Sequence, residues 1–90
     1  MKSRVLCLLA DGFEEIEFVV PVDLLRRAGI EVLVSSLKHE VVTGRSGIRV
    51  IADGVLEDQA IDAFQMLLIP GGPGVNELRS DARVMMLARE

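Results

Sequence analysis

The apolar positions of the chain fall into short continuous runs that end at glycine or at charged residues. One mostly apolar run covers residues 4–10 and stops at an Asp-Gly pair, and a second, at 30–36, begins directly after Gly29. Continuous apolar runs, in contrast to alternating ones, are typical of strands buried on both faces of a sheet. We therefore predict two buried strands, at 4–10 and at 30–36.

The segment between these runs is helical in composition from Glu14 to Ala28. Gly29 stands where helices commonly end in a glycine. A strand, a helix and a second strand in this order predict a parallel pair of strands with a right-handed crossover.

The rest of the chain is less regular. We predict two short strands around a glycine-rich turn within 41–53, a short helix or a loop at 54–64, a buried strand at 65–70 and a helix at 76–90. A doubly wound α/β domain normally has five or more strands. We therefore predict that residues 1–90 are the N-terminal portion of a single α/β domain that is incomplete here.

Glu17 is unexpected within the predicted helix. On a helical wheel it falls in the middle of an apolar arc that includes Val20 and Leu24. A carboxylate buried in such an arc must be paired, hydrogen-bonded or protonated. The alternative is that Glu17 lies in the first helical turn, where acids favour the helix dipole and reach solvent. Apolar residues outside this arc, such as Ile16 and Val19, suggest deep burial or a subunit interface.

The strand predicted at 65–70 ends in a glycine-rich turn that begins with Gly71 and Gly72. Ligands of open α/β sheets bind at the carboxyl ends of the strands. Glycines let the backbone approach a ligand and direct N–H groups at an anion, either a phosphate or an oxyanion. The turn matches neither the P-loop nor the dinucleotide-binding pattern, and a purely structural tight turn is the alternative.

Composition excludes several classes of function. The net charge is -4 and the basic residues are scattered, which argues against nucleic-acid binding. No apolar run approaches the length of a membrane span. A single cysteine gives no disulfide framework and no four-ligand zinc site, so we predict a cytoplasmic protein without metal or cofactor. Cys7 lies inside the first apolar run and is expected to be inert, and His39 is expected at the surface.

Two stretches together resemble the DJ-1/ThiJ/PfpI superfamily, and most closely its DJ-1/YajL-like branch: "DGFEEIEFVVPVDLLRRAGI" and "LLIPGGPGVNEL". The resemblance implies a flavodoxin-like parallel sheet sandwiched by helices, of the class I glutamine amidotransferase-like type, and a homodimer formed through the first helix. It also implies a catalytic cysteine in contact with a glutamate that matches Glu17. When protonated, this glutamate would hydrogen-bond the cysteine and stabilise its thiolate or sulfinate. Gly72 would supply an oxyanion-hole N–H, and Gly71 would shape the turn.

The chain departs from the family pattern because the family's elbow cysteine would lie beyond Glu90. The resemblance implies a cysteine-dependent glyoxalase, deglycase, amidase or peptidase, or an oxidative-stress-responsive chaperone, acting on a small electrophile or a peptide. The 90 residues alone would then be inactive. The alternative is a non-catalytic flavodoxin-like module that dimerises or binds a small ligand.

Overall fold

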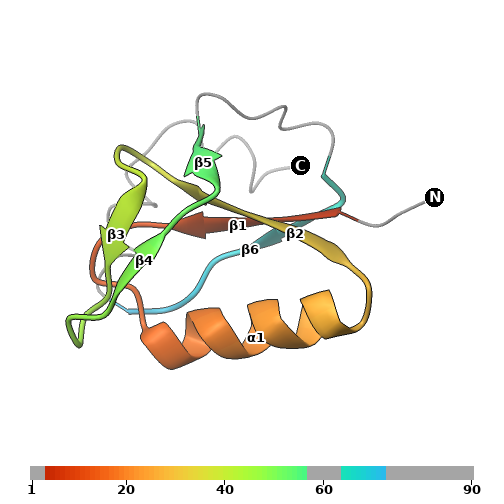
Figure 1. The fold of residues 1–90 in the computed structure, drawn as a ribbon, viewed down its shortest axis with the longest axis horizontal. Helices are drawn as coiled ribbons and strands as arrows, with labels where there is room; N and C mark the ends of the chain where they lie inside the picture. The colour runs from red at the N-terminus through yellow and green to blue at the C-terminus, as the bar shows by residue number, and fades with distance from the viewer. Residues whose placement is uncertain (1–3, 57–63, 73–90) are drawn as a thin grey trace.

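The computed structural model describes residues 4–56 and 64–72 (Figure 1). Along the chain, the described elements are β1 (Arg4–Leu9), α1 (Glu15–Arg27), β2 (Glu31–Ser36), β3 (Val41–Thr43), β4 (Arg49–Ile51), β5 (Gly54–Val55) and β6 (Met66–Leu68). The helix predicted at 76–90 lies outside these residues. Within them, no helix is both long enough and apolar enough to cross a membrane.

Four strands form a parallel sheet in the order β5-β2-β1-β6. β1 lies inside this sheet, and its Cys7, Leu8 and Leu9 have no exposed surface. The buried strands predicted at 4–10 and 30–36 are thus confirmed as β1 and β2. The β-α-β unit predicted around them is confirmed as well, because β1 and β2 pair in parallel.

The two outer strands differ from the prediction. The segment 54–64 was expected to be a short helix or a loop, but its first two residues form β5, which pairs with β2. β6 is confirmed as a strand, although its Met66 is 58% exposed. The reason is that β6 is an edge strand within the described sheet and pairs there with β1 alone.

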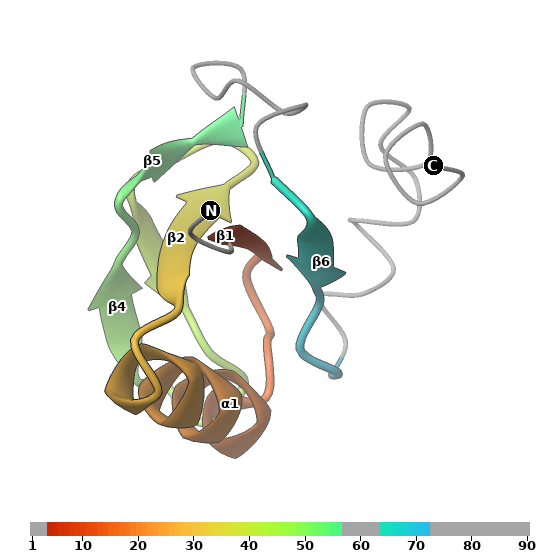
Figure 2. The ribbon, with the colours of Figure 1, turned by 90° about the vertical axis from the view of Figure 1, so that its right-hand side faces the viewer.

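α1 covers one face of the sheet, as Figure 2 shows from the side. Its Phe18 and Val22 are buried against that face, and the ring of Phe18 meets that of Phe13 edge to face with centroids 5.4 Å apart. The third buried residue of the helix is Glu15, whereas Glu17 is exposed. Burial of Glu17 in the apolar stripe is therefore wrong, and the alternative, an exposed acid in the first helical turn, is confirmed. The helix is apolar on two sides, and the side without Glu17 faces the sheet.

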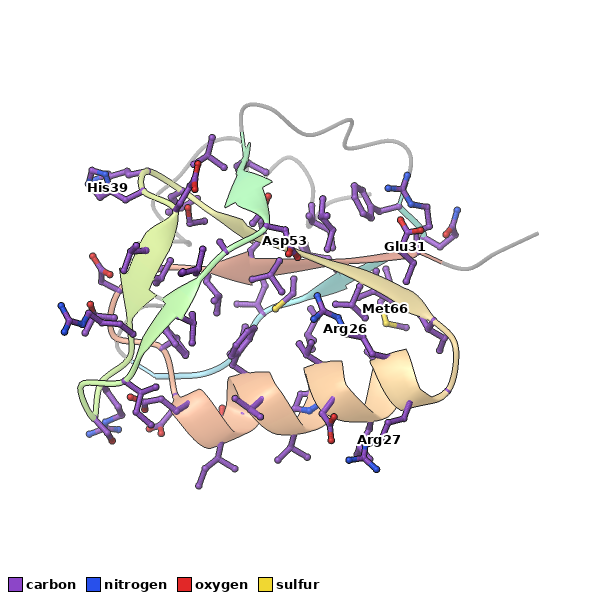
Figure 3. The ribbon with its side chains drawn as sticks, viewed as in Figure 1. Arg26, Arg27, Glu31, His39, Asp53 and Met66 are labelled. Carbon is purple, nitrogen blue, oxygen red and sulfur yellow. The ribbon has the colours of Figure 1, made fainter. Side chains whose placement is uncertain are left out.

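A charged pair fixes the C-terminal half of α1 over β2. Figure 3 shows Arg26 pointing from the helix toward Asp53, which directly precedes β5. The Arg26 guanidinium donates to the carbonyl of Val32 at 2.8 Å and to the Asp53 carboxylate at 3.3 Å. The same carboxylate accepts the N–H of Val34 at 2.8 Å. Helix, β2 and the start of β5 are thereby joined by one polar network.

β3 and β4 form the antiparallel hairpin predicted within 41–53. The turn contains Gly47 at a φ of 93°, a left-handed conformation that glycine adopts at little cost. The tip of the hairpin lies against the entrance of α1, where the Arg45 N–H donates to the carbonyl of Phe13 at 2.9 Å. This contact brings the hairpin to the carboxyl-end edge of the sheet.

Candidate active site

Two hydrogen bonds of Gly71, one donated and one accepted, hold the turn after β6 against the start of α1. The Gly71 N–H donates to Oε1 of Glu17 at 2.9 Å, and the Glu14 N–H donates to the Gly71 carbonyl at 2.9 Å. Glu17 and Gly71 are 54 positions apart in the sequence. The structure therefore brings together two of the three residues that the sequence singled out, at the carboxyl end of β6.

The space around Gly71 and Gly72 admits only glycine without rearrangement. A Cβ on Gly71 would lie 2.3 Å from Oε1 of Glu17. Gly72 has a φ of 105°, and a Cβ there would lie 2.7 Å from the Gly12 carbonyl and 2.9 Å from the Glu14 nitrogen. Because both of those neighbours of Gly72 are backbone atoms, they cannot swing aside as a side chain can. The Gly72 N–H finds no hydrogen-bond acceptor among the described residues.

Glu17 keeps one carboxyl oxygen available. Its Oε1 accepts the Gly71 N–H, and no described residue bonds to Oε2. A further hydrogen-bond partner of this carboxyl group would therefore bind at Oε2. Exposed Val20 and Leu24 lie on the same side of the helix, at i+3 and i+7 from Glu17. Glu17 thus stands on an exposed apolar surface with a hydrogen-bonding oxygen free.

Glu15, which did not stand out in the sequence, is the buried carboxylate of this helix. Its Oε2 accepts the N–H of Ser46 at 2.8 Å and of Ile48 at 3.3 Å. Burial raises the pKa of Glu15, but hydrogen bonds from backbone N–H groups and the Ser46 side chain outweigh burial and leave the pKa below its ordinary value. The spacing to Phe18, three residues on, and to Val22, seven residues on, is the signal that could have placed Glu15 on the buried face.

Arg45 was also missed, and it lies beside the glycine turn. Its guanidinium donates to the Glu14 carboxylate at 2.5 Å, and this bond raises the pKa of Arg45 above its ordinary value. The Glu14 side chain itself approaches Gly72, because its Cγ would lie 3.1 Å from a Cβ at that position. Glu14 therefore holds the Arg45 guanidinium next to Gly72.

Cys7 and His39 take no part in this arrangement. Burial raises the pKa of the Cys7 thiol to about 12, although the nearby Arg26 lowers it in part, so the prediction that Cys7 is inert is confirmed. His39 is exposed, as predicted, and lines a cavity of about 180 Å³ at the carboxyl ends of β1 and β2. None of the three predicted site residues lines that cavity.

Among the described residues, no group of three or more acids, histidines and cysteines could hold a metal ion.

Comparison with known proteins gives consistent similarities. The model of the DJ-1/PfpI family matches residues 3–90. A deglycase of Pyrococcus abyssi is 38% identical over 87 residues, which are 97% of this chain and 52% of that protein. A glutathione-independent glyoxalase of Caenorhabditis elegans is 38% identical over 77 residues, 86% of this chain and 41% of that protein.

Solved structures agree with these matches. The crystal structure of Drosophila melanogaster DJ-1beta superposes with a TM-score of 0.93 at 37% identity, covering 99% of this chain and 49% of that one. The chain spans about half the length of the curated relatives it matches. The flavodoxin-like α/β fold expected from the sequence is therefore confirmed over this half.

Proposed function

Because the chain belongs to the DJ-1/PfpI family, we propose that Glu17, Gly71 and Gly72 form one half of the active site of a cysteine-dependent enzyme. Residues 1–90 are the N-terminal portion of a single α/β domain, and the nucleophilic cysteine comes from sequence outside them. The reaction is of the glyoxalase or deglycase type, on a small electrophilic carbonyl compound. Relatives that carry these two names support this class over an amidase or a peptidase.

In this mechanism the cysteine thiolate attacks an aldehyde carbon. The C–S bond forms, and the π electrons of the carbonyl move to its oxygen, which becomes an oxyanion. The Gly72 N–H has no acceptor among the described residues and can donate to that oxygen. Glu17 presents Oε2 to the sulfur, where a protonated carboxyl donates a hydrogen bond and favours the thiolate over the thiol.

One observation carries this proposal, namely the bond from the Gly71 N–H to Oε1 of Glu17. It orients the carboxyl group and leaves Oε2 as the oxygen directed at a further partner. It also joins the acid and the oxyanion donor rigidly, since Gly72 directly follows Gly71. We expect a carboxyl group positioned beside the nucleophile to contribute roughly 10²–10⁴-fold to rate, the range known for positioned acid and base groups.

The test is methylglyoxal turnover by the full-length protein and by a Glu17→Ala variant. We expect kcat/KM to fall by about 10²–10⁴-fold. Glu40→Gln is the matched control, because Glu40 is exposed and lies outside the site, and its activity should equal that of the wild type. Equal turnover by wild type and Glu17→Ala would refute the role of Glu17. Absence of turnover in the wild type would favour a non-catalytic, dimerising or ligand-binding module.

The assembly that fits this half-domain is a homodimer through α1. Four large apolar side chains of the helix are at least 49% exposed: Ile16, Val19, Val20 and Leu24. Exposed apolar patches of this kind mark contact surfaces. In light scattering we expect Leu24→Arg to convert a dimer to a monomer, whereas Asp23→Arg on the polar side of the helix should remain dimeric. A monomeric wild type would overturn the dimer.

The single buried thiol of Cys7 is compatible with a reducing cytoplasm, where we place the protein. In that compartment the proposed active-site thiolate would also react with peroxide to give a sulfenic or sulfinic acid. A response to oxidative stress would then use the same cysteine as the carbonyl chemistry.

A further inference from the structure

The tip of the β3–β4 hairpin is fixed at the entrance of α1 from two directions. The Arg45 N–H donates to the Phe13 carbonyl at 2.9 Å. In the residues that follow Arg45, the N–H groups of Ser46 and Ile48 both donate to the Glu15 carboxylate, at 2.8 and 3.3 Å. Because these bonds fix the backbone at and next to Arg45, the side chain of Arg45 starts from a fixed position.

The side chain of Arg45 is directed to the border of the proposed active site. Its Nη1 donates to Oε1 of Glu14 at 2.5 Å. Glu14 in turn donates its own N–H to the Gly71 carbonyl at 2.9 Å, and its Cγ would lie 3.1 Å from a Cβ on Gly72. A single carboxylate therefore lies between the guanidinium and the Gly72 N–H, which has no acceptor among the described residues.

Arg45 retains the capacity to bind a second anion. A guanidinium has five N–H donors in a planar fork, and the bond to Glu14 uses one of them. The side chain is 53% exposed, and no other acceptor for it lies among the described residues. Two N–H groups of an arginine match the two oxygens of a carboxylate, which makes such pairs specific as well as strong.

The charges around the turn give this cation a particular role. Glu14 and Glu17 both lie next to the glycines, so that a negatively charged substrate would meet carboxyl groups on entering. We infer that Arg45 is a specificity-determining residue that binds the carboxylate of an acidic 2-oxoaldehyde substrate while its aldehyde carbon faces the nucleophile. This inference rests on the proposed function, because it presupposes the carbonyl chemistry at Gly72.

The substrate class follows from the reaction. A 2-oxoaldehyde with a distal carboxylate, such as 4,5-dioxopentanoate, takes up one water and becomes a 2-hydroxydicarboxylate. Its aldehyde carbon is oxidised to a carboxylate and its neighbouring ketone is reduced to an alcohol, so no external oxidant or reductant is required. Methylglyoxal undergoes the same conversion but has no carboxylate for Arg45 to bind.

The experiment compares kcat/KM for 4,5-dioxopentanoate with kcat/KM for methylglyoxal, using the full-length protein. In Arg45→Met we expect the ratio of the two values to fall by about 10–100-fold, which corresponds to the loss of a charge-assisted hydrogen bond, with a raised KM for the acid. Arg45→Lys should give an intermediate ratio, because it keeps the charge and loses the fork. Arg49→Met removes the same charge from the same hairpin and should keep the wild-type ratio.

An unchanged ratio in Arg45→Met, with both substrates turned over, would overturn the inference and leave the proposed function intact. An equal fall in Arg45→Met and Arg49→Met would also overturn it, because the effect would then be one of overall charge. If the wild type turned over neither substrate, the proposed function itself would fail. The two failures are therefore distinguishable.

Discussion

Glu15 and Glu17 stand two residues apart on the same helix, and each accepts a backbone N–H from a distant glycine-rich turn. Glu15 is buried and holds the hairpin tip through the N–H groups of Ser46 and Ile48. Glu17 is exposed and holds the turn after β6 through the single N–H of Gly71. The first carboxylate accepts two N–H groups of the hairpin through Oε2, and the second accepts one N–H group through Oε1.

Under the proposed function, the difference separates a structural acid, Glu15, from a functional one, Glu17. Hydrogen bonds from the protein stabilise the ionised form of Glu15 and lower its pKa despite burial, so that it acts as a fixed anchor. Oε2 of Glu17 accepts no hydrogen bond from the described residues, so a partner bound there would leave the bond to Gly71 in place. Under the proposed function, burial alone would have selected Glu15 instead of Glu17.

The largest effect on stability should come from the turn that Glu17 holds. In Gly72→Ala we expect a loss of about 2–5 kcal/mol, from a left-handed φ that alanine resists and from overlap with backbone atoms. Gly29→Ala is the matched control, since its φ is 83° and nothing lies within 4 Å of the added Cβ. Urea denaturation of both variants separates the two costs. Equal losses would show that the turn tolerates a Cβ.

The second-largest effect on stability should come from Glu15, which holds the hairpin tip. Glu15→Ala removes the acceptor of two N–H groups at the hairpin tip, and we expect the Tm to fall by about 5–10 °C. Differential scanning calorimetry measures this change. A Tm within a degree of the wild type would show that water replaces the carboxylate without cost.

A smaller effect should appear as a pH dependence. Because the folded-state pKa of Glu15 is lowered, its contribution is fully present above the ordinary pKa of 4.5 and is lost as pH falls through the folded-state value. The Tm of the wild type should therefore decline below about pH 4.5 more steeply than that of Glu15→Gln. Parallel declines in the two proteins would assign the acid sensitivity to other groups.

The smallest effect on stability should be that of Glu17→Ala. Glu17 is exposed and accepts one N–H, so we expect a change within about 0.5 kcal/mol in urea denaturation. Its activity loss, measured as described above, should be large by comparison. A destabilisation comparable to that of Glu15→Ala would mean that the two acids do not differ in kind.

Much of the fold could be predicted because its signals are local. The apolar runs of β1 and β2 and the glycine after α1 each identify an element from a few neighbouring residues. β5 gave no such signal, since two residues become a strand only when β2 lies beside them. The exposure of Met66 likewise depends on the position of β6 in the sheet and not on its composition.

The candidate site could be predicted in its residues but not in its geometry. The glycines after β6 and the acid at position 17 stood out as residue types. The orientation of α1 did not, because Phe18 and Val22 on one side and Val20 and Leu24 on the other are equally apolar. A helical wheel does not show which of two apolar sides of a helix is buried. That depends on which side contacts the sheet.

The bond between Glu17 and Gly71 also has a consequence for the order of events during biosynthesis. The 54 positions between them must be translated before the glycine exists, which takes about 3–10 s at roughly 5–20 residues per second. α1 can form early from local interactions, but during that interval its acid has no turn to hold. The contact between α1 and the turn after β6 therefore forms late in folding, only when β6 joins β1.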